Sequence, residues 1–148
     1  MDITVREMTS SDRTAFGEMR AHLWPEETPD QHLAWIDRFL RDGDARVFVV
    51  AAANGLVGFA EVAIRKYANG CESAPVPFLE AIWVKPEMRR LGIGRQLMEH
   101  IEAFLTARGD RELGSDAMIE NSVSHAAHEG WGFSETERVV YFRKPLTG

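Results

Sequence analysis

The chain has 148 residues, of which 45% are hydrophobic and 27% are charged, and its formal net charge is −6. This length and composition predict one globular domain over residues 1–148 and exclude an extensively disordered chain. The negative charge argues against nucleic acid as a partner, because such binding depends on basic side chains that neutralise phosphates. The sequence has no run of 18 apolar residues, so no membrane span is expected either.

The cysteine content and the first residues favour a cytoplasmic protein. Residues 1–6 lack the basic flank and apolar core of a secretory signal. Cys71 is the single cysteine, so no intrachain disulfide can form, which favours a reducing compartment. We expect Cys71 to be a small thiol in a loop rather than a nucleophile.

The N-terminal part of the chain predicts a short strand, residues 3–8, followed by two helices. A cluster of helix-capping side chains at residues 9–12 precedes the first helix, which extends to about residue 22. Two prolines then interrupt helical propagation and predict a loop. Pro29 itself begins the second helix, which Gly43 ends.

The middle of the chain predicts a β-hairpin, a loop and a further strand. Residues 47–53 and 56–64 are rich in β-branched and apolar side chains, and the Asn54-Gly55 pair between them is a strong hairpin signal. Residues 66–77 contain Gly, Ser, Pro and Asn, which predicts a loop. Residues 78–84 form the next predicted strand.

A glycine-bearing turn after that strand is the most informative stretch, and it opens a predicted amphipathic helix over residues 93–108. Glycines lack a Cβ, so the backbone can approach a ligand closely. The helix directs its first N–H groups and the positive end of its dipole at the turn. The pattern predicts a pyrophosphate-binding site. Its residues are Arg89, Arg90, Leu91, Gly92, Ile93, Gly94 and Arg95.

The last third predicts two strands on either side of a helix. The strands are residues 112–117 and 139–143, and the helix is residues 121–129. The order of all these elements predicts an α/β (α+β) domain with a mixed, mostly antiparallel sheet.

This order of elements resembles the GNAT superfamily of acyl-CoA-dependent N-acetyltransferases over essentially the whole chain. The Arg89-Arg90-Leu91-Gly92-Ile93-Gly94 turn and the Asn121…Gly132-Phe133 segment carry the resemblance. It implies a central sheet that is splayed between strands 4 and 5, with helices on both faces. Shorter segments resemble the chromosomal branch of the aminoglycoside 6'-N-acetyltransferases: Leu23-Trp24-Pro25, Tyr67-Ala68-Asn69-Gly70-Cys71, Pro77-Phe78-Leu79-Glu80, Ser115-Asp116 and Glu135-Thr136-Glu137-Arg138-Val139.

The resemblance implies acetyl-CoA as the co-substrate and no metal. The backbone of Ile82, Trp83 and Val84 would pair with the pantetheine arm of acetyl-CoA, as an added strand does. Asn121 would also hydrogen-bond the pantetheine arm, although the same side chain can be a plain helix N-cap.

The pyrophosphate of acetyl-CoA would lie on the backbone amides of residues 90–95. Arg89, Arg90 and Arg95 would supply positive charge. The alternative for these three side chains is that they only solvate the start of a helix.

Transfer requires a neutral acceptor amine, so a carboxylate or a water chain must take its proton. Glu80 and Asp116 lie on neighbouring predicted strands at the splay and are the candidates, through water or through a raised pKa. The alternatives are a salt bridge for Glu80 and a strand-end cap for Asp116. The N–H of Val84 would polarise the thioester carbonyl. His128 stands where many GNAT enzymes carry a tyrosine, and it would either protonate the leaving thiolate or only hydrogen-bond and pack.

An aminoglycoside is a polycation built on sugar rings, so its pocket should offer carboxylates and aromatic faces. Core packing is the alternative for the aromatic candidates, and a rim salt bridge is the alternative for Glu137. Trp35, Trp83 and Trp131 lie in periodic elements and are predicted to pack. The candidate substrate-binding residues are Trp24, Glu27, Tyr67, Glu72, Glu80, Asp116 and Glu137.

The resemblance therefore implies direct acetyl transfer, in a ternary complex, from acetyl-CoA to the 6'-amine of aminoglycoside antibiotics, and hence antibiotic resistance. It also implies a homodimer in which the C-terminal strand is exchanged. Two alternatives stay open. One is a GNAT enzyme for another small polyamine or a protein N-terminus. The other is a non-catalytic acyl-CoA-binding module, which would bind CoA without acetylating any amine.

Overall fold

The computed structural model of the chain describes residues 2–147. It forms two compact units, Met1–Asp116 and Ala117–Gly148, and each is described by itself. A single domain over residues 1–148 stays a prediction. In chain order, with η for a short 3-10 helix, the elements are β1 (Thr4–Glu7), η1 (Ser10–Asp12), α1 (Arg13–Arg20), α2 (Pro29–Arg41), β2 (Arg46–Ala52), β3 (Gly55–Arg65), β4 (Val76–Val84), η2 (Pro86–Met88), α3 (Ile93–Arg108), β5 (Gly114–Ser115) and α4 (Ser122–Gly130).

A mixed sheet organises the first unit. Its strands follow the order β1-β2-β3-β4-β5 among the described residues. The first four strands are antiparallel neighbours, whereas β5 pairs with β4 in parallel. Parallel neighbours need a crossover connection, and α3 supplies it between β4 and β5. The predicted mixed, mostly antiparallel sheet is therefore confirmed.

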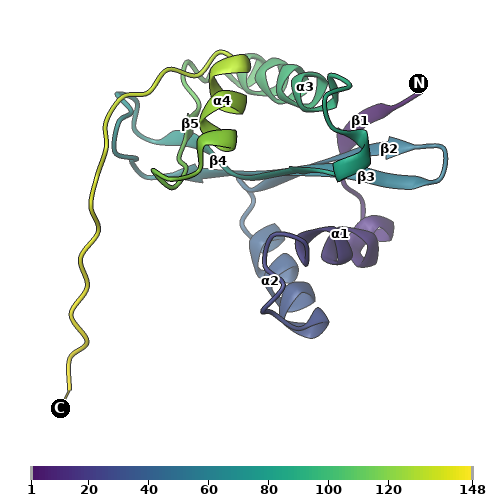
Figure 1. Cartoon of the computed structure of the whole chain (residues 1–148), viewed down its shortest axis with the longest axis horizontal. Helices are drawn as coiled ribbons and strands as arrows, with labels where there is room; N and C mark the ends of the chain where they lie inside the picture. The colour runs from purple at the N-terminus through teal and green to yellow at the C-terminus, as the bar shows by residue number, and fades with distance from the viewer. Residues whose placement is uncertain (1, 148) are drawn as a thin grey trace. The chain divides into compact units, whose positions relative to one another are not determined.

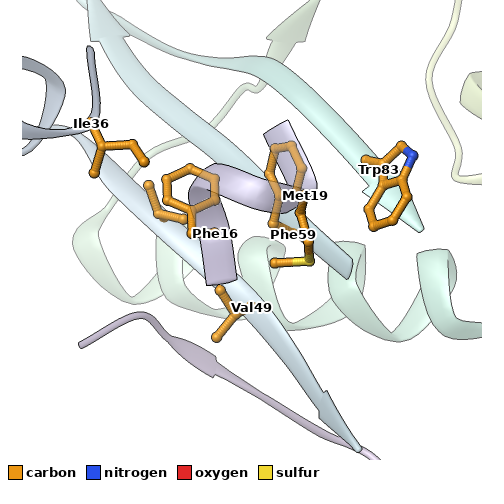
Figure 2. Packing of buried hydrophobic residues seen from close by; sticks show 7 residues of the cluster. Phe16, Met19, Ile36, Val49, Phe59 and Trp83 are labelled. Atoms are coloured by element: carbon orange, nitrogen blue, oxygen red, sulfur yellow. The ribbon is translucent and has the colours of Figure 1, made fainter. Parts of the chain in front are cut away.

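Helices cover both faces of this sheet (Figure 1). On one face α1 and α2 bury Phe16, Met19 and Ile36 against Phe59 and Trp83 of the strands (Figure 2). On the other face lies α3, and the ring of Phe104 packs edge-on against Phe48 at a centroid distance of 5.4 Å. Alternation along β2 explains the division, since neighbouring side chains of a strand point to opposite faces.

The helix boundaries follow local signals in the sequence. Thr28 and Gln31 form a reciprocal capping box at the start of α2, with hydrogen bonds of 2.7 and 3.1 Å, and Pro29 occupies the first helical position. Gly92 and Gly109 flank α3 in the left-handed region, with φ of 80° and 94°. The predicted helix over residues 93–108 is confirmed to the residue. No helix of the described residues is both long and apolar enough to cross a membrane.

Two predicted strands differ from the structure. The strand expected over residues 112–117 is reduced to Gly114–Ser115, because only these residues pair with β4. The strand expected over residues 139–143 is wrong, since the structure gives this segment no strand. Its side chains are solvent-exposed, with Val140 at 77% and Phe142 at 91%. A strand needs a neighbour for its N–H and C=O groups, and the apolar pattern alone does not supply one.

Candidate functional site

The two parallel strands separate soon after they pair. Among the described residues, β4 and β5 are in register only at Phe78 with Gly114 and at Leu79 with Ser115. After these two pairs, residues 81–84 of β4 keep their pairing with β3 but have no ladder partner on the β5 side. The sheet is therefore open along one edge of β4, as predicted for Ile82, Trp83 and Val84. An open strand edge can accept an extended, amide-bearing ligand.

The backbone of β4 directs the Val84 N–H into this opening. The N–H of Lys85 donates to the carbonyl of Val57 in β3, at 2.8 Å. Because N–H groups alternate sides along a strand, the Val84 N–H points to the opposite side, where β4 is unpaired. The Val84 carbonyl on that side accepts a hydrogen bond of 2.7 Å from Nε of Arg89. Arg89 thus fastens the end of β4 to the turn that follows.

This turn has the backbone of an anion site. Arg90 is left-handed with φ 64°, which is uncommon for a residue with a side chain, and Gly92 follows with φ 80°. The first intrahelical bond of α3 runs from the Gln96 N–H to the Gly92 carbonyl, so the N–H groups of Ile93 and Gly94 lie ahead of it at the positive end of the helix. A Cβ built on Gly92 would meet no protein atom within 4 Å, so a ligand has room to approach there.

The charge around the turn suits a diphosphate. Arg89, Arg90 and Arg95 are all exposed, and so is Leu91 between them. Backbone N–H groups at a helix start and nearby guanidinium groups together favour phosphate oxygens. The described residues therefore fit the diphosphate of CoA at the turn and its pantetheine amides along the open edge of β4.

Glu80 lies where β4 departs from regular pairing. Glu61 of β3 faces Ala81, and the next residue, Val62, faces Leu79, so Glu80 is the extra residue of a bulge. Bulges redirect side chains and are frequent beside active sites. The Glu80 carboxylate is half-buried and forms a two-pronged salt bridge with Arg65 at 2.7 and 2.8 Å. The salt bridge expected as the alternative for Glu80 is therefore present.

Asp116 lies across the opening from Glu80. Leu79 and Ser115 are paired in parallel, so Glu80 and Asp116 are the next residues on two strands that diverge from that pair. The hydroxyl of Ser115 also donates to the Leu79 carbonyl at 3.3 Å, which holds the two strands together at their last contact. Asp116 is exposed. The structure thus brings the two predicted carboxylates to the same point of the sheet.

Trp24 and Glu27 share the loop between α1 and α2. Trp24 is half-buried, and its indole lies over the guanidinium of Arg20, 4.4 Å from the ring centroid. The Trp24 carbonyl is 3.1 Å from Nε2 of His32. The Glu27 side chain is 37% exposed, and its Oε2 lies 3.7 Å from Nδ1 of the same histidine.

Tyr67 and Glu72 lie on the long loop between β3 and β4. The Tyr67 side chain is 74% exposed, so the predicted alternative of core packing is wrong for it. The backbone N–H groups of Glu72 and Ser73 donate to the carboxylate of Glu112, at 2.8 to 3.1 Å. These hydrogen bonds lower the pKa of Glu112. Glu112 therefore anchors this loop. No local pattern signals this contact, because Glu72 and Glu112 are 40 residues apart.

The second unit carries the remaining candidates. The Asn121 side chain accepts a hydrogen bond of 3.1 Å from the Ser124 N–H, so the helix N-cap is confirmed. Nδ1 of His128 lies 2.7 Å from the Ser124 carbonyl within α4. Glu137 is exposed in the segment after the helix.

Three functional candidates were missed by sequence reasoning: Arg20, His32 and Glu61. All are buried, with 3%, 1% and 1% exposure. Burial raises the pKa of Glu61 to about 7, although Arg20 acts in the opposite direction. A charged side chain within the apolar run of residues 56–64 was the one signal that could have revealed Glu61. Arg20 pairs with it across 41 positions of sequence, which no local pattern can show.

The predicted packing of tryptophans is confirmed for Trp83, which is 7% exposed in the core. Its ring stacks on His22 at 4.8 Å. Trp35 stacks on Phe39 at 4.6 Å and packs against the same core. Trp83 can therefore contribute to the open edge only through its backbone.

A model of the Acetyltransferase (GNAT) family matches residues 5–133 of the chain. The aminoglycoside N(6')-acetyltransferase type 1 of Stenotrophomonas maltophilia is 46% identical over 145 residues, which cover 97% of this chain and 94% of that protein. The protein of the same name from Salmonella enteritidis is 38% identical over 141 residues, which cover 95% and 97% respectively.

Two solved structures have the same fold throughout. AAC(6')-Iy in complex with the bisubstrate analog CoA-S-monomethyl-acetylneamine has a TM-score of 0.92 and 37% identity, and the match covers 99% of this chain and 100% of that one. The aminoglycoside antibiotic 6'-N-acetyltransferase AAC(6')-Ih from Acinetobacter baumannii has a TM-score of 0.91 and 33% identity, with the same coverage.

Proposed function

The chain belongs to the acetyltransferase (GNAT) family, and from that premise we propose that it is an acetyl-CoA-dependent aminoglycoside 6'-N-acetyltransferase. It transfers the acetyl group of acetyl-CoA to the 6'-amine of an aminoglycoside antibiotic and so confers resistance. One observation carries the proposal: β4 presents the Glu80 carboxylate two residues before an unpaired edge that leads directly into the glycine-bearing turn at the start of α3. A single strand can thus serve both substrates.

Acetyl-CoA is held by backbone groups more than by side chains. The open edge at Ile82, Trp83 and Val84 pairs with the pantetheine amides, and the N–H groups at the start of α3 receive the diphosphate. Arg90 and Arg95 add positive charge. Arg89 contributes through its hydrogen bond to the Val84 carbonyl. This bond fixes the position of the turn before α3 relative to the open edge of β4. In the second unit, the amide of Asn121 adds a further contact to pantetheine, in addition to capping α4.

Glu80 and Asp116 receive the acceptor ammonium at the splay. Two carboxylates attract the cationic 6'-amine, and its proton leaves through them or through water. The neutral amine then forms its bond to the thioester carbonyl carbon, and the bond to sulfur breaks. The Val84 N–H stabilises the negative charge that develops on the carbonyl oxygen.

The transfer is direct, without an acetylated enzyme. Cys71 is the single cysteine of the sequence, and burial raises the pKa of its thiol, which disfavours the nucleophilic thiolate. The leaving thiolate needs a proton. His128 stands in the position where many GNAT enzymes carry a tyrosine, but its Nδ1 is bound to the Ser124 carbonyl, which favours a hydrogen-bonding and packing role over that of the proton donor.

The acceptor pocket combines aromatic faces with carboxylates. Trp24 and Tyr67 offer rings to the sugars, while Glu27, Glu72 and Glu137 offer negative charge to the remaining ammonium groups. Tyr67 and Glu137 are exposed and thus accessible to a ligand.

We propose a homodimer in which residues 139–143 of one chain pair with a second copy. This segment is rich in β-branched and aromatic residues, yet it has no strand partner within the described chain, and its side chains are exposed. Such a segment is stable as a strand only when another chain supplies the neighbour. We place the enzyme in the cytoplasm, where acetyl-CoA is made.

A thiol-release assay with purified protein and acetyl-CoA tests the function. Kanamycin and tobramycin should both release CoA, whereas spermidine and a peptide with a free N-terminus should not. Release with spermidine or the peptide alone would instead support the alternative acceptors. CoA binding without release on any amine would leave an acyl-CoA-binding module. Cells that express the chain should become resistant to both drugs, and unchanged sensitivity would contradict the aminoglycoside assignment.

A further inference from the structure

A buried polar network lies beneath the loop that carries Trp24 and Glu27, and the proposed mechanism does not use it. Arg20 of α1, His32 of α2 and Glu61 of β3 form this network, and none is more than 3% exposed. Buried polar and charged groups are tolerated when every group has a partner, because an unpaired one costs several kcal/mol. The arrangement of the partners therefore shows what the network holds in place.

Hydrogen-bond chemistry fixes the direction of the network. Arg20 donates from Nε to Oε2 of Glu61 at 2.7 Å, and its terminal nitrogen lies 3.1 Å from Nδ1 of His32. A guanidinium has no acceptor, so His32 must accept at Nδ1 and carry its proton on Nε2. Nε2 then donates to the Trp24 carbonyl at 3.1 Å. The chain of donors thus runs from Arg20 through His32 to the backbone of the loop.

Arg20 also contacts the Trp24 side chain. Its guanidinium lies 4.4 Å from the Trp24 ring centroid and 3.6 Å from that of Trp35. Arginine stacks on aromatic faces through both charge and its flat shape. One buried cation therefore fixes the indole of Trp24 directly and its carbonyl through His32.

The network connects this loop to the strands that carry the reacting groups. Glu61 pairs in β3 with Ala81 of β4, directly beside the bulge at Glu80. The negative charge of Glu80 is close enough to raise the pKa of Glu61. The network thereby fixes the position of the loop between α1 and α2 relative to Glu80, although the two are more than 50 residues apart in sequence.

We propose that Arg20 and His32 are positioning residues for the acceptor: they hold Trp24 at a fixed distance from Glu80. Glu27 is held with it, because the Glu27 N–H donates to the same Trp24 carbonyl at 3.2 Å. The proposal rests on the proposed function, because it assigns these loop residues to the aminoglycoside. A buried ion pair contributes little net stability compared with well-packed apolar side chains. The ion pair instead orients the loop that carries Trp24. A small displacement of a side chain that contacts the substrate can lower the rate of catalysis strongly.

Two variants remove the network while keeping the core filled. The double variant Arg20→Met/Glu61→Leu replaces the ion pair with apolar side chains, and His32→Phe removes both histidine hydrogen bonds. The matched control is Asp37→Asn, which breaks the bidentate pair between α1 and α2 at Arg13, with hydrogen bonds of 2.8 and 2.9 Å, but does not touch the loop.

We expect both network variants to raise the KM for tobramycin about tenfold or more. The KM for acetyl-CoA and the kcat should change less than about threefold. Asp37→Asn should change none of these constants. An unchanged KM for tobramycin in a folded network variant would overturn the proposal, and His32→Phe decides the matter if the double variant does not fold.

Amide hydrogen exchange gives a readout that needs no substrate. Residues 21–28 should exchange faster in His32→Phe than in the wild type, while α3 exchanges at the same rate in both. Unchanged exchange over residues 21–28 overturns the inference whatever the activity. If the wild type acetylates no aminoglycoside, the proposed function fails, and faster exchange in this loop would still support its attachment by the network.

Discussion

Arg65 binds both carboxylate oxygens of Glu80, with Nε 2.8 Å from Oε2 and a terminal nitrogen 2.7 Å from Oε1. The same guanidinium lies 3.5 Å from the centroid of the Phe78 ring. A salt bridge and a role in transfer are compatible, because an ionised carboxylate has lone pairs for more than two donors. The ion pair therefore orients the Glu80 carboxylate at the bulge and leaves it able to accept a further hydrogen bond from the acceptor amine.

Glu80→Gln should therefore impair transfer without unfolding the protein. Loss of the charge weakens attraction for the acceptor ammonium and interrupts the path of its proton, so kcat/KM for tobramycin should fall about 100-fold. Steady-state thiol release measures this ratio. Asp37→Asn is the control, because it removes an equally bidentate arginine–carboxylate pair away from the sheet opening. Equal losses in the two variants would assign Glu80 a structural role only.

Gly92→Ala should weaken acetyl-CoA binding more than its effect on folding explains. Gly92 and Gly109 flank the same helix with φ of 80° and 94°, and a Cβ at either meets no protein atom within 4 Å. Each alanine should thus destabilise the fold by about 1 kcal/mol, through the backbone alone. Only Gly92→Ala places a methyl group against the proposed diphosphate. Its KM for acetyl-CoA should rise several-fold while that of Gly109→Ala stays unchanged, and matching values would argue against a diphosphate at this turn.

The buried Glu61 should make stability depend on pH between about 4.5 and 7. Its pKa is raised from 4.5 to about 7 by burial, so the folded state binds a proton more readily than the unfolded state. The contribution of Glu61 to the free energy of unfolding is therefore complete below its pKa in the unfolded chain, and it is lost as the pH rises through 7. Urea unfolding should show a loss of the order of 3 kcal/mol across this window in the wild type, and a flatter dependence in Glu61→Gln.

A second carboxylate provides the control for this pH series. Arg6 lowers the pKa of Asp12 to about 2, the opposite direction. The stability that this pair contributes is complete above about pH 4 and is lost as the pH falls to 2, so Asp12→Asn should remove the slope between pH 4 and 2 and leave the slope between pH 5 and 8 as in the wild type. Parallel curves for the wild type and Glu61→Gln would show that Arg20 keeps Glu61 ionised throughout.

His128→Phe should retain kcat to within about threefold. The Ser124 carbonyl accepts from Nδ1 at 2.7 Å, so the neutral ring has its lone pair, not its proton, on Nε2. A neutral ring in this state cannot donate a proton to the leaving thiolate from Nε2. Single-turnover rates should be measured, because loss of a general acid costs about 100-fold or more. A fall of that size would identify His128 as the acid in its charged form.

Removal of residues 139–148 should convert a dimer to a monomer. The exposed apolar side chains of Val140, Tyr141 and Phe142 supply the proposed contact with a second copy. Light scattering after size-exclusion chromatography measures the mass. Val123→Ser is the control, since Val123 is equally exposed at 81% but lies on α4 outside the segment. A truncated chain that stays dimeric would place the interface elsewhere.

The sequence was sufficient for features that depend on neighbours in the chain. Gly92 and Gly109 delimit α3, Asn54-Gly55 marks the hairpin, and Thr28 caps α2, because dihedral preference and local hydrogen bonds act over a few residues. The glycine-bearing turn before α3 was predicted for the same reason.

Strand pairing was less predictable, since a strand exists only when its neighbour is present. The apolar pattern of residues 139–143 gave the right composition for a strand but could not say whether one chain provides the partner. The short β5 differs from its predicted length for the same reason, because its pairing with β4 stops where the sheet opens.

By itself the sequence determined the family-like order of elements, the glycine-bearing turn before α3, and Glu80 and Asp116 as carboxylates at adjacent strand positions. Only the tertiary structure decided that Glu80 is held by Arg65 and that Arg20 links Glu61, His32 and Trp24 in one buried network. The two kinds of feature differ in how far apart in the sequence the interacting residues lie. Local patterns fix backbone conformation, whereas a buried charge finds its partner across the fold, where desolvation makes that pairing obligatory.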